Sequence, residues 1–121
     1  MDDFTNPDKT IHCFFVDDPG TGPNGGPAQH FASCRTETPS QDALLFYDGR
    51  VILCRDGVPF PCIQQWYVED THGLAAGQRT QLQGFECLVE AAAVTCTIVS
   101  GAAKGRGFTI SLAGASEIVP P

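Results

Sequence analysis

Residues 85–98 read Phe-Glu-Cys-Leu-Val-Glu-Ala-Ala-Ala-Val-Thr-Cys-Thr-Ile, and this segment predicts a disulfide-bonded β-hairpin. Apolar and polar residues alternate with the period of two that sends successive strand side chains to opposite faces. A connection centred on Ala91-Ala92 sets Cys87 opposite Cys96, so alternation and cysteine register agree and predict a disulfide between them. Glu90 to Ala93 form a poor two-residue turn, which favours a four-residue loop in the same register. The residues of the shared apolar face are Phe85, Cys87, Val89, Val94, Cys96 and Ile98.

Six cysteines are the strongest compositional feature of this 121-residue chain. An even number in so small a domain is typical of three disulfides formed in an oxidising compartment. A zinc site would need closely spaced pairs of the C-x₂₋₄-C type, and no such pair is present. The six are Cys13, Cys34, Cys54, Cys62, Cys87 and Cys96.

The other two bridges are expected on different grounds, one from the local sequence and one by elimination. Cys54 and Cys62 bracket the turn signal Asp56-Gly57, and the prolines that follow it forbid a regular strand ladder. We therefore expect a bridge that closes this short loop. Cys13–Cys34 then follows by elimination and spans the glycine-rich segment between them.

Residues 43–54 predict a second hairpin. Asp48-Gly49 is a preferred type I′ turn between two apolar runs, and it pairs Phe46 with Val51 and Leu44 with Leu53. Both faces of this hairpin are apolar, so we expect it to lie centrally in a sheet that is covered on both sides.

The other segments predict further short strands and loops within one domain, 1–121. Strands are expected over 10–16, 30–35, 63–68, 78–82 and 107–112, with disorder over 1–3 and a long Gly/Pro loop over 17–29. Only 74–82 has a helical period, and its glycines weaken it. The fold class is therefore all-β: a small antiparallel β-sandwich or open barrel of about eight or nine short strands with three disulfides.

The charge balance restricts the partners of this domain. Fourteen acidic residues against seven basic ones give a formal net charge of −7, which argues against binding to nucleic acid or to anionic membranes. No apolar run approaches the ~18 residues of a membrane span. The acidic start Met1-Asp2-Asp3 lacks the apolar core of a signal peptide. We expect a monomer without a cofactor.

The opening segment 4–13, Phe-Thr-Asn-Pro-Asp-Lys-Thr-Ile-His-Cys, resembles a pattern F-x-S-P-S-G-N-I-x-C, and segments of the closing half resemble L-x-Y-G-Q, G-F-x-C, V-T-C and G-x-G-F-x-x-S. Together these motifs resemble an uncharacterised family of actinobacterial secreted and lipoprotein domains of unknown function. The segments that carry this resemblance are 4–13, 74–78, 84–87, 94–96 and 105–111, whereas 17–29 and the surroundings of Cys54 and Cys62 depart from it. The resemblance implies export, disulfides and a bacterial cell envelope, and it brings no catalytic residues.

No catalytic or metal-binding signature stands out. The three histidines, His12, His30 and His72, have no H-x-H or H-E-x-x-H spacing, although a Cys13–Cys34 bridge could bring the strands of His12 and His30 together. The acidic pairs Asp17-Asp18 and Glu69-Asp70 lack the calcium-loop pattern. There is no G-x-S-x-G elbow, and oxidised cysteines argue against a Cys–His enzyme.

Two segments are candidate binding residues. Trp66 and Tyr67 are adjacent on an expected strand, so one ring faces the core and the other is available as a platform for sugar or peptide. The loop 54–62 is stiffened by a disulfide and two prolines, and such loops lower the entropic cost of binding. Its candidate contact residues are Val58, Pro59, Phe60 and Pro61.

These features favour a non-catalytic binding domain of the bacterial cell envelope, outside the cytoplasm, with a protein or envelope ligand. The alternative is a secreted protease inhibitor that uses the loop 54–62. A hydrolase of unknown type stands third.

Overall fold

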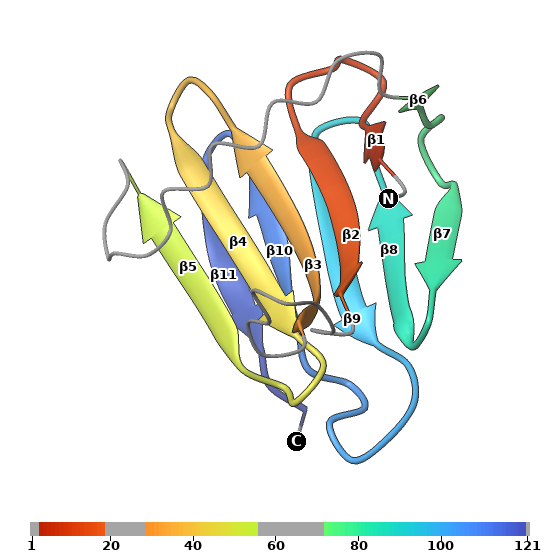
Figure 1. Ribbon diagram of the computed structural model, residues 1–121. Coiled ribbons are helices and arrows are strands. Elements are labelled where there is room, and N and C mark those ends of the chain that lie inside the picture. The colour runs from red at the N-terminus through yellow and green to blue at the C-terminus, as the bar shows by residue number, and fades with distance from the viewer. Residues whose placement is uncertain (1–2, 19–28, 56–71, 121) are drawn as a thin grey trace, which may run out of the picture.

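The computed structural model describes residues 3–18, 29–55 and 72–120, which form two β-sheets packed face to face (Figure 1). Sheet A has six strands in the order β5-β4-β3-β2-β1-β6, and sheet B has five in the order β11-β10-β9-β8-β7. Sheet A consists of β1 (Asp3–Thr5), β2 (His12–Asp18), β3 (Gln29–Thr36), β4 (Gln41–Phe46), β5 (Val51–Arg55) and β6 (His72–Gly73). Sheet B consists of β7 (Arg79–Leu82), β8 (Phe85–Val89), β9 (Ala93–Ile98), β10 (Gly107–Ser111) and β11 (Gly114–Ile118).

This architecture confirms the all-β expectation and settles it as a sandwich. Strands pair antiparallel throughout, apart from the two-residue β6, which lies parallel to β1. The described residues contain no helix, and β7 occupies the end of the segment with a weak helical period. No helix of the described residues is long and apolar enough to cross a membrane.

The core lies between the two sheets and is built from the alternate residues that the strand period predicts. In β8 and β9 every second residue is buried. Phe15 of sheet A and Phe85 of sheet B stack with ring centroids 6.2 Å apart, and Phe4 packs against Phe15 at 5.9 Å. Each such ring contributes roughly 1.5–3 kcal/mol by its removal from water, so this aromatic contact joins the sheets firmly.

Two disulfides face one another across this core. Cys87–Cys96 links β8 to β9 and Cys13–Cys34 links β2 to β3, each between directly opposed residues, as the sequence predicts. The Sγ atoms of Cys34 and Cys96 approach to 3.9 Å, so the two bridges touch. The third expected bridge lies partly outside the described residues, because Cys62 is not among them.

The β8–β9 register is confirmed, with Val89 opposite Val94. The connection is tighter than the four-residue loop favoured by the sequence. The N–H of Glu90 donates to the carbonyl of Ala93 at 2.8 Å, which leaves only two residues beyond the last hydrogen bond.

The register expected for the β4–β5 hairpin is wrong by one residue. Leu45 pairs with Val51 and Leu44 pairs with Ile52. The cause is the turn: Gly49, with φ +97°, donates its N–H to the Phe46 carbonyl at 2.9 Å. A type I turn followed by a left-handed glycine adds one residue to the loop in place of the two-residue type I′ turn.

The hairpin is covered on both faces, as expected, but β5 is not central, because it ends the described part of sheet A. One face belongs to the inter-sheet core. The outer face carries a second cluster of buried residues, Phe14, Phe31, Leu44 and Cys54.

Three boundaries differ from the expectations. Asp3 belongs to β1 and is not disordered, because it pairs with Phe14. The expected loop over 17–29 is shorter at both ends, since β2 runs to Asp18 and β3 begins at Gln29. The strands β1, β6 and β11 were not expected, so the described residues contain eleven strands where eight or nine were predicted.

Candidate functional site

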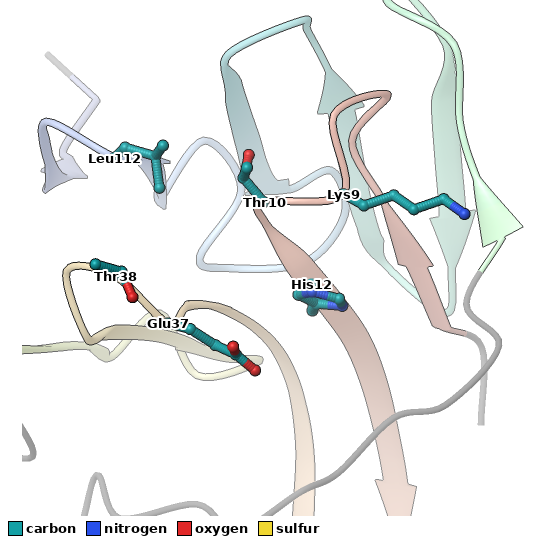
Figure 2. A pocket seen from close by; sticks show the side chains of 6 residues that line it. All are labelled: Lys9, Thr10, His12, Glu37, Thr38 and Leu112. Carbon is teal, nitrogen blue, oxygen red and sulfur yellow. The ribbon is translucent and has the colours of Figure 1, made fainter.

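A pocket of about 210 Å³ lies at one end of the sandwich, where three connections meet (Figure 2). The first is the 6–11 connection between β1 and β2, the second is the 37–40 turn between β3 and β4, and the third is the turn between β10 and β11. The lining side chains are Lys9, Thr10, His12, Glu37, Thr38 and Leu112. Segments far apart in the sequence therefore supply one concave surface.

Asn6 holds the first connection in shape. Its side chain is fully buried, and its Oδ1 accepts the backbone N–H groups of Thr10 and Ile11, both at 2.9 Å. Its Nδ2 donates to Thr10 Oγ1 at 2.9 Å and to the Ala91 carbonyl at 3.2 Å. The last bond reaches the β8–β9 turn, so this connection is fixed to sheet B and Thr10 has a defined place in the pocket.

Gln41 joins the second connection to the third. Its buried amide donates to Thr36 Oγ1 at 3.1 Å and to the Ser111 carbonyl at 2.9 Å, and Thr36 Oγ1 in turn donates to the Pro39 carbonyl. Ser111 directly precedes Leu112. The turn that carries Glu37 is therefore tied to the strand end that carries Leu112.

The polar groups of the pocket are of both charges and are open to a ligand. Lys9 and Glu37 are exposed, and neither forms an ion pair with another residue of the described ranges. In Figure 2 the side chain of Lys9 extends away from Glu37, while Glu37, Thr38 and Leu112 border the hollow. Leu112 is 43% exposed and gives the pocket an apolar wall.

A row of polar side chains continues from the pocket along the outer face of sheet A. The strand register sets His12 opposite Arg35 and Arg35 opposite Asp42. Asp42 is only 8% exposed, and its burial raises the pKa of its carboxyl above the ordinary value, while the Arg35 guanidinium opposes that shift. Its Oδ1 has no hydrogen-bond partner, which is costly for a buried carboxylate.

The residues that the sequence singled out for binding cannot be compared with this pocket, because the structure does not describe them. Val58, Pro59, Phe60, Pro61, Trp66 and Tyr67 all lie outside the described residues, as does the acidic pair 69–70. The inhibitory use of the loop 54–62 therefore stays a prediction.

The strand register shows where His12 and His30 lie relative to one another. His12 lies opposite Arg35 and His30 lies opposite Asp17, so these histidines are at opposite ends of β2 and β3 and do not meet. Within 3–18, 29–55 and 72–120, no three His, Cys, Asp or Glu side chains gather as metal ligands would.

No family model, curated protein or solved structure matches this chain. The site must therefore be interpreted from its own chemistry. Its lining supplies one carboxylate, one ammonium, one imidazole, two hydroxyls and an apolar wall, which suits the binding of a small polar group with an aliphatic part.

Sequence reasoning missed most of this pocket. His12 entered only as a metal candidate, and Lys9, Thr10, Glu37, Thr38 and Leu112 were not considered. The available signal was the polar turn composition of 6–10 and 36–41. Such composition predicts turns, but it does not show which turns meet at the same end of a sandwich.

Proposed function

We propose that this chain is a non-catalytic binding module that works outside the cytoplasm and takes part of its ligand into the pocket of Glu37 and Leu112. The observation that carries the proposal is a preformed hollow with an exposed carboxylate and an apolar wall, whose connections are held in place by the hydrogen bonds of the buried side chains Asn6 and Gln41. Preorganised loops on a rigid scaffold are the usual form of a recognition site, because little entropy is lost on binding.

Two features support a location outside the cytoplasm. The bridges Cys13–Cys34 and Cys87–Cys96 are buried in the core, and such structural disulfides are typical of oxidising compartments. The motif resemblance to actinobacterial secreted and lipoprotein domains supports the bacterial cell envelope as the place of action. A protein or envelope component is then the natural ligand.

The proposal is tested by NMR on the intact ¹⁵N-labelled chain against a panel of amines, sugars and short peptides of the envelope. We expect saturable shifts for the amides of Thr10, Glu37 and Leu112, with every compound recovered unchanged. Shifts confined to other surfaces, or enzymatic conversion of a compound, would contradict the proposal. Glu117→Gln, an exposed change outside the pocket, serves as the control variant.

A further inference from the structure

We infer that the ligand group this pocket accepts is a primary ammonium on an aliphatic chain, as in a lysine side chain. The inference rests on the proposed binding function and specifies its ligand class. It follows from the lining of a cavity of about 210 Å³, which has one carboxylate, two hydroxyls, one exposed leucine and one imidazole around it. The sixth lining residue is Lys9, whose side chain extends away from the other five in Figure 2.

The carboxylate of Glu37 supplies the charge. In Figure 2 the Glu37 side chain extends from its turn toward His12, and the described residues offer it no cationic partner. Lys9 is the other charged lining residue, but it is exposed and its side chain extends away from the hollow. The charge nearest a ligand in the pocket is therefore negative, which favours a cation.

The hydroxyls of Thr10 and Thr38 suit the three N–H donors of an ammonium. Thr10 Oγ1 accepts one bond from Asn6 Nδ2 at 2.9 Å and keeps a second lone pair. Together with Glu37 these oxygens provide acceptors from two different connections. An ammonium needs several acceptors at once when it leaves water, so this arrangement fits it better than a neutral apolar group.

The exposed side chain of Leu112 suits the aliphatic stem. A methylene chain that lies on this leucine removes apolar surface on both partners from water, while the charged head stays among polar atoms. The net charge of −7 adds an attractive field for cations around the whole molecule.

The experiment compares two probes by NMR titration of the intact protein: Nα-acetyl-lysine methylamide and the same compound acetylated at Nε. The two differ in the positive charge and are similar in their stems. We expect saturable shifts of the Thr10, Glu37 and Leu112 amides with the first compound only. Raising the ionic strength from about 0.01 M to about 1 M should weaken the binding, because Glu37 is exposed to screening ions.

Two variants should change the affinity for the charged probe in opposite directions. Glu37→Gln should weaken binding of the charged probe by about two- to fivefold, the range of an exposed ion pair. Lys9→Gln removes a nearby like charge and should strengthen binding by up to about twofold. Both positions are exposed, so neither change should unfold the domain, and the unchanged spectrum of the remaining residues checks this.

The possible outcomes distinguish a failure of the ammonium inference from a failure of the proposed binding function. An equal response to both probes, or a response unchanged by Glu37→Gln, overturns the ammonium inference and leaves the binding function in place. The absence of any response at the pocket to these probes and to the whole panel of amines, sugars and peptides overturns both.

Discussion

Asn6 fixes the shape of the 6–11 connection that lines the pocket. Replacing it with alanine removes four hydrogen bonds and leaves the N–H groups of Thr10 and Ile11 without their acceptor. We expect Asn6→Ala to lower the free energy of unfolding by about 2–4 kcal/mol, because each orphaned buried donor costs on the order of 1 kcal/mol or more. Urea denaturation measures the loss.

Asn6→Asp is the matched variant for that prediction. It keeps an oxygen that can accept from Thr10 and Ile11 and loses the two bonds donated by Nδ2. A carboxylate is also costly to bury. Hydrogen exchange at Ile11 should therefore be faster in Asn6→Ala than in Asn6→Asp, and equal rates would show that the Oδ1 bonds do not organise this connection.

Asp42 gives the protein a predictable dependence on pH. A carboxyl whose pKa is raised on folding holds its proton more tightly in the folded than in the unfolded chain. The stability it contributes is thus present at acid pH and is lost as the pH rises from the ordinary value of 3.8 through the raised pKa. Asp42→Asn should remove this slope and raise stability at pH 7 by on the order of 1 kcal/mol.

Thermal unfolding of wild type and Asp42→Asn between about pH 3 and pH 8 tests whether the variant is the more stable protein at neutral pH. The two curves should converge at the acid end, where Asp42 is protonated. A variant that is less stable than wild type at neutral pH would mean that the pairing with Arg35 outweighs the desolvation of the carboxylate.

At the scale of elements, the β7–β8 turn and the β4–β5 turn fit together through a glycine. A Cβ on Gly84 would lie 2.5 Å from Tyr47 Cε1, and its φ of +96° already disfavours a side chain. Gly77 has a similar φ of +90°, and a Cβ there would have nothing within 4 Å. Gly77→Ala therefore introduces the same backbone strain as Gly84→Ala but no steric clash. Gly84→Ala should therefore cost about 1–3 kcal/mol more than Gly77→Ala.

Denaturation of both variants, with and without Tyr47→Ala, measures that difference. Removal of the Tyr47 ring should lessen the cost of Gly84→Ala and leave that of Gly77→Ala unchanged. Equal costs for the two glycines in the presence of the ring would show that the turns do not pack as described.

The two hairpins show which elements a sequence can specify. In β8–β9 two independent patterns, alternation and a cysteine pair, required the same register, and the structure has it. In β4–β5 both faces are apolar, so a one-residue slip changes no burial pattern, and only the turn decides. Asp48-Gly49 suits a type I′ turn and also a type I turn with a left-handed glycine. The predicted register of β4 against β5 was therefore shifted by one residue from the observed one.

At the scale of the whole molecule, the all-β class and two bridges were predictable, and the pocket was not. Cysteine number and turn signals are local features that survive in a linear sequence. The pocket depends on the 6–11 connection, the 37–40 turn and Leu112 meeting at one end of the sandwich. That meeting is set by strand order and sheet packing, which no single segment encodes.

The contact between the two disulfides predicts that they stabilise the molecule as a coupled pair. By loop-closure entropy, each bridge is worth roughly 2.5–3.5 kcal/mol, and Cys13–Cys34, with a sequence separation of 21 against 9, closes the longer loop. Because the Sγ atoms of Cys34 and Cys96 touch at 3.9 Å, removal of either bridge also deprives the other of a packing partner.

The three variants Cys13→Ala/Cys34→Ala, Cys87→Ala/Cys96→Ala and the combination of all four substitutions form a double-mutant cycle. The combined loss of unfolding free energy should be smaller than the sum of the two separate losses by about 0.5–1 kcal/mol, since the shared contact is then counted once. The cycle is measured by urea denaturation under oxidising conditions, which keeps the remaining bridge intact in each single-bridge variant. Strict additivity would mean that the sulfur contact between the two bridges carries no energy.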